Sequence, residues 1–105
     1  SLGAVSGIAV TRTLDSSKEV DKRLDARNKV ALFDLQETWV LKVRNLRDEP
    51  APLLIREHHE GAWKLEQSDT DCDRLGAETL SFEIAVEPGE ETAILFRIRH
   101  QNRQP

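Results

Sequence analysis

The feature that most constrains this chain is the regular alternation of apolar and polar residues in its second half. The apolar positions recur every two residues in two segments, at Leu80, Phe82, Ile84 and Val86 and then at Ile94, Phe96 and Ile98. A period of two places successive side chains on opposite faces of a strand, so each segment predicts a strand with one buried face. Pro88-Gly89 separates the two segments and predicts either a hairpin or a turn that crosses between sheets.

The same alternation marks shorter strands upstream. Every second residue is apolar at Ile8 and Val10, at Trp39, Leu41 and Val43, at Leu53 and Ile55, and at Trp63 and Leu65. Polar turns or loops are expected at residues 45–50, 59–61 and 68–76. Six or seven short strands without interleaved helices predict an all-β fold, an antiparallel immunoglobulin-like two-sheet β-sandwich. With 105 residues, the chain is expected to form one domain over residues 1–105.

Residues 16–27 do not show this alternation. Ser16 and Glu19 have the spacing of a helical capping box, and Val20 and Leu24 lie one helical turn apart. We therefore expect residues 16–27 to be a loop or a short helix, followed by a strand over residues 30–35.

Composition and charge exclude several classes of function. The net charge is −4, with both signs mixed along the chain, which argues against a nucleic-acid partner. No segment approaches the roughly 18 apolar residues that a membrane span needs. The single cysteine, Cys72, excludes an internal disulfide and a multi-cysteine metal site. Since the chain lacks Met and begins at Ser1, we expect a module excised from a longer protein, with a frayed tail over residues 101–105.

The strongest candidate metal site in the sequence is a run of alternate aspartates. Asp69, Asp71 and Asp73 offer hard carboxylate oxygens of the kind that Ca²⁺ prefers. The run is not an EF-hand, because the positions that need Gly and Glu hold Arg74 and Leu80. We therefore expect either a looser calcium loop or a solvated acidic loop.

A second group of candidate ligands is His58, His59 and Glu60. Imidazole and carboxylate groups bind divalent transition metals. Adjacent residues of a strand point to opposite faces, however, so both histidines are not expected to bind one ion. A solvated turn before Gly61 is the simpler interpretation. His100 would add a third imidazole if the fold brought it close.

Other chemically suggestive residues have structural explanations. Carboxylates near Cys72 should raise its pKa, so an activated thiolate is not expected. Trp39 and Trp63 could stack on a sugar, but their apolar neighbours favour core packing. Arg44, Arg47, Arg56, Arg97 and Arg99 could form a modest basic stripe, but a charged outer sheet face that discourages edge pairing is the simpler explanation.

Part of the chain is similar to a known family. Trp39-Val-Leu-Lys-Val-Arg-Asn45 followed by Asp48-Glu-Pro-Ala-Pro52 resembles the opening of the bacterial domain of unknown function 4139 (DUF4139), and residues 63–66, 77–86, 88–91 and 94–99 fit the later part of that family's pattern. The resemblance covers about residues 28–100. It implies an immunoglobulin-like sandwich in the C-terminal part of bacterial proteins that are often exported, and it implies no catalytic residues. Members often carry a Tyr in the closing strand, where this chain has Phe96.

These observations favour a non-enzymatic accessory or interaction module of a larger bacterial cell-envelope protein. Its partner is expected to be another protein or the rest of its own polypeptide, docked on a sheet edge or on loops at one end. No glycine-flanked serine nucleophile and no phosphate-binding loop occurs. The alternative is a calcium- or carbohydrate-binding module that uses the Asp69–Asp73 loop or an exposed Trp, with no cofactor other than that Ca²⁺. A metal enzyme built on His58 and His59 is the weakest hypothesis.

Overall fold

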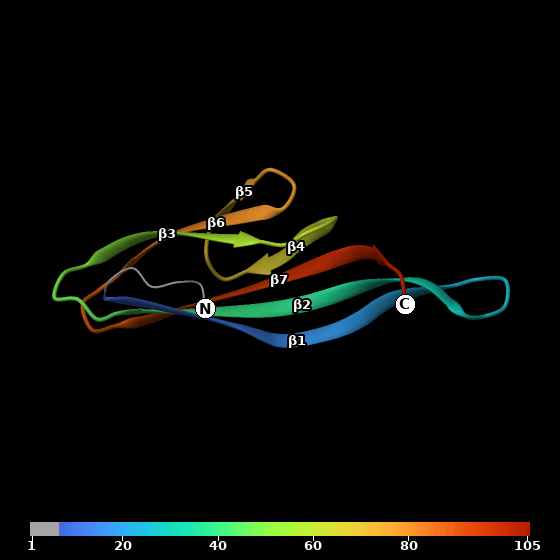
Figure 1. Cartoon of the computed structure of the whole chain (residues 1–105), viewed down its shortest axis with the longest axis horizontal. Coiled ribbons are helices and arrows are strands. Elements are labelled where there is room, and N and C mark those ends of the chain that lie inside the picture. The colour runs from blue at the N-terminus through green and yellow to red at the C-terminus, as the bar shows by residue number, and fades with distance from the viewer. Residues whose placement is uncertain (1–6) are drawn as a thin grey trace.

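The computed structural model describes residues 7–105, which form two antiparallel β-sheets (Figure 1). The strands are β1 (Ile8–Leu24), β2 (Val30–Asn45), β3 (Ala51–His58), β4 (Trp63–Ser68), β5 (Cys72–Leu75), β6 (Thr79–Val86) and β7 (Glu91–Arg103). The larger sheet has the order β1-β2-β7-β4, and the smaller has the order β3-β6-β5. The prediction of an all-β, two-sheet sandwich with six or seven strands is confirmed.

The strand order places β7 at the centre of the larger sheet. A constant-type immunoglobulin domain, numbered in the same way, has sheets 1-2-5-4 and 3-6-7. Here the fifth and seventh strands have exchanged sheets. As a result β7 pairs with β2 on one side and with β4 on the other, which brings the C-terminal end of the chain beside the β3–β4 turn.

The core lies between the two sheets and consists of the alternating residues that the sequence marked. Its fully buried members include Leu41, Val43, Leu80, Phe82, Ile94, Phe96 and Ile98. The rings of Phe82 and Phe96, one from each sheet, lie 5.5 Å apart between centroids. The period-two pattern therefore correctly identified which face of each strand is buried.

The Pro88-Gly89 segment crosses between the sheets, because β6 belongs to the smaller sheet and β7 to the larger one. Asn45, which is fully buried at the end of β2, stabilises this crossing. Its side-chain amide donates hydrogen bonds to the carbonyl oxygens of Glu49 (2.7 Å) and Val86 (2.9 Å). Its side-chain oxygen accepts one from the backbone N–H of Arg47 (2.9 Å).

The expectation for residues 16–27 was wrong, because β1 continues as a strand to Leu24. The pairing of β1 with β2 has register shifts after Leu14 and Val20, and Asp21 has a positive φ of 49°. Extra residues at such bulges interrupt the period-two alternation. This interruption left only local helical signals in the sequence, and pairing along β2 outweighs them.

Three further expectations need smaller corrections. The strand expected over residues 30–35 is the first part of β2, which runs without a break to Asn45. The expected loop over residues 68–76 contains the short strand β5. The tail is not frayed from residue 101, because β7 continues to Arg103.

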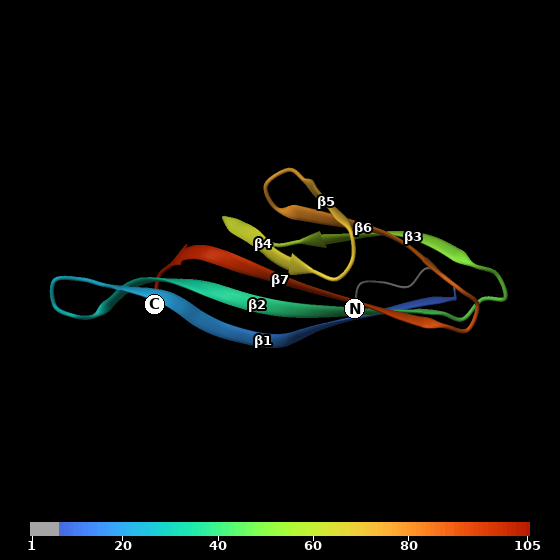
Figure 2. The ribbon, with the colours of Figure 1, turned by 180° about the vertical axis from the view of Figure 1, so that it is seen from behind.

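The larger sheet extends past the smaller one, so the molecule is elongated, with dimensions of 62 × 24 × 22 Å. Both views show the far half of the β1–β2 hairpin projecting beyond β3 and β6 (Figures 1 and 2). Within residues 7–105 there is no helix that is long and apolar enough to cross a membrane.

Candidate functional site

A cluster of two histidines and one glutamate, His59, His100 and Glu37, lies where β2, β7 and the β3–β4 turn come together. Glu37 is opposite Ile98 in the β2–β7 pairing, and His100 is opposite Leu35. Because residues directly opposite each other share a face, Glu37 and His100 are diagonal neighbours on the inner face of the larger sheet. His59 follows the last residue of β3 and approaches them from the smaller sheet.

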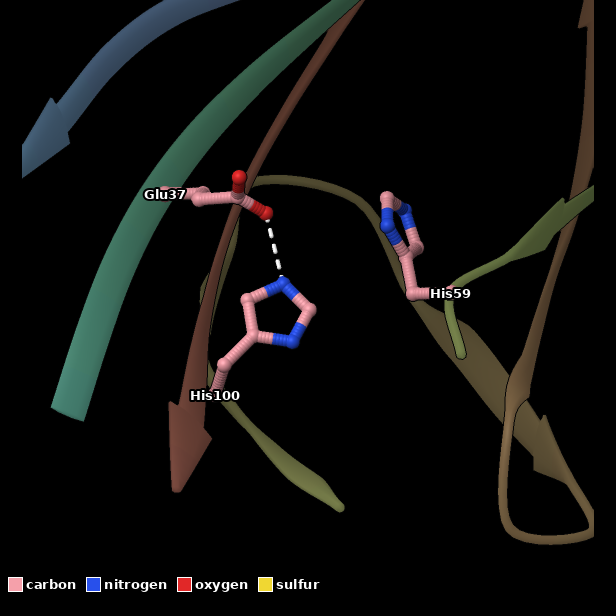
Figure 3. A group of neighbouring side chains, drawn as sticks. All are labelled: Glu37, His59 and His100. Carbon is pink, nitrogen blue, oxygen red and sulfur yellow. Dashed lines mark hydrogen bonds and ion pairs between the residues drawn. The ribbon is translucent and has the colours of Figure 1, made fainter. Parts of the chain in front are cut away.

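The three side chains are close enough to interact. Nε2 of His100 lies 2.6 Å from Oε1 of Glu37, a hydrogen-bond distance. The ring of His59 faces this pair, with its centroid 6.3 Å from that of His100 (Figure 3). One ligand atom from each of the three residues lies within 4.8 Å of the others. The arrangement therefore offers two imidazoles and one carboxylate to a common point.

This cluster is buried but not saturated with hydrogen bonds. The side chains of His59 and His100 are each 6% exposed, and that of Glu37 is 14% exposed. Nδ1 of His100 and Nε2 of His59 are buried and make no hydrogen bond within the described structure. Buried polar atoms without partners are uncommon in folded proteins, so each needs an explanation.

The buried carboxylate of Glu57 lies next to His59. Oε1 of Glu57 lies 3.3 Å from Nε2 of His59, although the two groups are not aligned as a hydrogen bond. The same oxygen accepts a hydrogen bond from Nε of Arg12 at 2.8 Å. Burial raises the pKa of Glu57, but the interactions with His59 and Arg12 outweigh it, and the net pKa is lowered. Glu57 is therefore a charged group that can orient the His59 ring.

Aromatic rings surround His59. Trp39, Trp63 and Phe96 have ring centroids 5.5, 6.0 and 5.9 Å from that of His59. Nε1 of Trp63 donates a hydrogen bond to the carbonyl oxygen of His59 at 2.7 Å, which fixes the turn. On the other side, Glu37, His59 and His100 border an open pocket of about 600 Å³. An ion or small ligand could reach the cluster from this pocket.

The structure separates the histidines that are adjacent in the sequence. His58 and Glu60 are exposed, as expected of a solvated turn, whereas His59 is buried, which was not expected. Nε2 of His58 lies 3.8 Å from Glu78, away from the cluster. The expectation that His58 and His59 point to opposite faces is thus correct, and His100 supplies the second imidazole.

Sequence reasoning did not single out Glu37 or Glu57. Both lie in phase with buried apolar residues, Glu37 with Leu41 on β2 and Glu57 with Ile55 on β3. A carboxylate that takes an apolar position in an alternating strand is a detectable signal. The meeting of Glu37 with His100 depends on strand register, which the sequence pattern does not specify.

The three aspartates of the expected calcium loop take different roles. One oxygen of Asp69 accepts hydrogen bonds from the backbone N–H of Leu95 (3.0 Å) and the hydroxyl of Thr70 (2.9 Å). Asp71 and Asp73 border a small hollow of about 180 Å³. Cys72 lies between them, and its pKa is raised by burial and further by these two carboxylates. The direction expected for this thiol is confirmed, and calcium binding stays a prediction.

Both tryptophans pack against the core, as expected. Trp63 is 3% exposed, and Trp39 is partly buried beside the pocket. The guanidinium of Arg12 lies 3.9 Å from the ring centroid of Trp39, and that of Arg74 lies 3.7 Å from Trp63. Each ring therefore already has a cation over one face, which leaves less surface for sugar stacking.

Arg99, on β7, belongs to a mixed charge network. Arg99 lies within 2.7 Å of Asp21, 3.1 Å of Glu66 and 3.5 Å of Asp34. A backbone hydrogen bond from Asn102, with ion pairing, lowers the pKa of Asp34. These carboxylates surround Arg99, one member of the basic stripe expected from the sequence.

Fold and site together define a two-sheet β-sandwich with a buried histidine–glutamate cluster at one end of its core. Searches against models of known families, curated proteins and solved structures found no match. The resemblance to DUF4139 therefore stays a prediction.

Proposed function

We propose that this chain is a non-enzymatic interaction module of a larger bacterial cell-envelope protein. The observation that carries the proposal is the projecting β1–β2 hairpin. β1 is 17 residues long and forms one edge of the larger sheet. Nearly all of its residues after Val10 are exposed.

An edge strand presents unpaired backbone N–H and C=O groups, which another extended segment can pair with. Leu14 and Leu24, on β1, are 42% and 58% exposed, so pairing would also bury apolar surface. The bulges near Asp15 and Asp21 limit unspecific edge-to-edge association. The partner in this proposal is an extended segment that adds to β1, supplied by another protein or by the rest of the same polypeptide.

The cell-envelope assignment rests on a different argument, the resemblance of residues 28–100 to DUF4139. Members of that family are bacterial and often exported. A chain that faces the envelope would find its partner there, so the test uses envelope extracts of the cells that make the protein.

Site-specific photo-crosslinking tests the proposal. A photoreactive residue at Lys18 on β1 should form a discrete covalent adduct in the extract, whereas the same residue at exposed Glu83 on β6 should not. Mass spectrometry of the adduct distinguishes a separate protein from another part of the same polypeptide. Charged substitutions at Leu14 and Leu24 should abolish the adduct without loss of folding. No adduct at Lys18, or equal adducts at both positions, would contradict the proposal.

The alternative function, a calcium- or carbohydrate-binding module, has support from two features. Asp71 and Asp73 share a hollow, and Trp39 borders the larger pocket. Millimolar Ca²⁺ should then raise the melting temperature of the chain and not that of Asp71→Asn. A glycan ligand should change the fluorescence of Trp39. If neither Ca²⁺ nor glycans have an effect, this alternative is rejected.

A further inference from the structure

We propose that Glu37, His59 and His100 form a binding site for a divalent transition-metal ion of the Zn²⁺ type. The proposal is independent of the interaction function, because the site lies on the inner side of the sandwich and not on the free edge of β1. Its three donors come from β2, from the β3–β4 turn and from β7. The ion would tie together three segments that are distant in the sequence.

The donor set selects the class of metal. Two imidazole nitrogens and one carboxylate oxygen are a recognised set for Zn²⁺, and imidazole also suits Cu²⁺, Ni²⁺ and Co²⁺. Ca²⁺ instead requires six to eight oxygen ligands, which this site does not offer.

The distances allow coordination with small movements. Ligands about 2.0–2.1 Å from a tetrahedral zinc ion lie roughly 3.3 Å from one another. The ligand atoms of Glu37, His59 and His100 all lie within 4.8 Å of each other. Rotation of the two rings and of the carboxylate is enough to close the difference. The 2.6 Å contact between Glu37 and His100 would be replaced by bonds to the ion.

Two observations point to a ligand rather than to a simple buried ion pair. The side chains of His59 and His100 are each 94% buried, since 6% of each is exposed. Each ring nevertheless has one buried nitrogen, Nε2 of His59 and Nδ1 of His100, that makes no hydrogen bond with any of the described residues. Coordination of an ion through Nδ1 of His59 would place the ring proton on Nε2, and a small rotation of the ring would let Nε2 donate a hydrogen bond to Glu57, 3.3 Å away.

The surroundings of His59 match the usual support of a metal-bound histidine. Such a histidine generally donates its second ring N–H to a carboxylate or carbonyl oxygen. Nε2 of His59 lies 3.3 Å from Glu57, so His59 binds the ion through Nδ1 and Glu57 is a positioning residue. Arg12 holds Glu57 in place through its 2.8 Å hydrogen bond. The pocket of about 600 Å³ beside the cluster provides an entry path and room for a water molecule as the fourth ligand.

Isothermal titration calorimetry of the tag-free chain with Zn²⁺ is the first test. One ion per chain is expected, with a matching rise in melting temperature that a chelator reverses. Co²⁺ should give the visible absorption of a tetrahedral site with nitrogen and oxygen ligands. Mg²⁺ should give neither effect. The absence of Zn²⁺ binding at millimolar concentration overturns the proposal.

Variants then locate the site. His100→Ala, His59→Ala and Glu37→Gln should each weaken Zn²⁺ binding at least tenfold. Glu37→Gln keeps an oxygen that can accept a hydrogen bond from His100, so it remains informative if a histidine variant fails to fold. Glu57→Gln should weaken binding about 10–100-fold while one ion still binds.

His58→Ala is the matched control. His58 is adjacent to His59 and borders the same pocket, but its side chain is 58% exposed and outside the ligand set. Binding should stay within twofold of the unmodified chain. If His58→Ala abolishes binding while His100→Ala leaves it intact, the ion binds the exposed turn and the proposal is wrong.

Discussion

Removal of the Arg12 guanidinium offers the sharpest test of how the inner site is built. Arg12→Met keeps most of the aliphatic stem but leaves the carboxylate of Glu57, only 2% exposed, without its hydrogen bond from Arg12. The contact with His59 at 3.3 Å remains. The substitution therefore isolates a buried charge rather than opening a cavity.

The size of the effect depends on burial. Loss of one partner of a fully buried ion pair costs about 3–5 kcal/mol. The side chain of Arg12 is 30% exposed, so water screens part of the interaction. The guanidinium also lies over Trp39, a contact worth about 0.5–1 kcal/mol. We expect Arg12→Met to lower the free energy of unfolding by about 2–3 kcal/mol at pH 7. This corresponds to a fall of about 8–12 °C in melting temperature, at roughly 4 °C per kcal/mol.

The assay is urea unfolding followed by tryptophan fluorescence, because urea, unlike guanidinium chloride, does not screen charges. A double-mutant cycle with Glu57→Gln separates the pairwise interaction from other effects. Glu57→Gln removes the buried charge. Arg12→Met should therefore lower the free energy of unfolding less in the Glu57→Gln variant than in the unmodified chain, by at least about 1 kcal/mol. Arg56→Met, at an exposed position on β3, is the control and should change stability by less than about 0.5 kcal/mol.

The pH dependence of Arg12→Met adds a second readout. Without Arg12, burial disfavours the ionised form of Glu57, so the carboxyl group takes up a proton more readily. The difference in free energy of unfolding between Arg12→Met and the unmodified chain should therefore become smaller as the pH falls from 7 to 4. Two results would refute the account of Glu57 as a charge stabilised by Arg12. One is a decrease in the free energy of unfolding of less than about 0.5 kcal/mol at pH 7, and the other is a double-mutant cycle in which the effects of Arg12→Met and Glu57→Gln simply add.

The structure leads to three further expected outcomes. Asn45→Ala removes three side-chain hydrogen bonds at a fully buried position and should cost about 3 kcal/mol in urea unfolding, at roughly 1 kcal/mol each, whereas exposed Gln67→Ala should be neutral. The pKa values of Glu57 and Asp34 are lowered in the folded state from their usual 4.5 and 3.8. The unfolded chain then binds more protons, so melting temperature should be constant above about pH 5 and fall from pH 5 to pH 3; a flat profile would contradict this. Burial raises the pKa of Cys72 above its usual 9.0, so iodoacetamide should modify it more slowly at pH 8 in the folded chain than in urea, and equal rates would show that the thiol is not perturbed.

Much of the fold could be predicted because its core obeys a local rule. Leu80 and Phe82, like Phe96 and Ile98, alternate with polar residues, and each such strand can be recognised within a window of a few residues. Pro88-Gly89 marks where one strand ends. Whether that turn closes a hairpin or crosses between sheets depends on which strands pair, and the period-two pattern is the same in both cases.

The hairpin and the candidate metal site depended on long-range pairing. Residues 16–24 carry helical signals, yet they form a strand because β2 offers a long partner and bulges accommodate the extra residues. Position within a strand identifies Glu37 as unusual, but only the β2–β7 register sets it beside His100.

The sequence by itself therefore determined which segments become strands in the core and which of their faces are buried, since side-chain alternation is a property of neighbouring residues. The tertiary structure decided the strand order and with it the site. Glu37, His59 and His100 are separated by 22 and 41 residues along the chain, and they meet because β7 is inserted between β2 and β4. The position of β7 depends on how the two whole sheets pack together, and no short stretch of sequence encodes it.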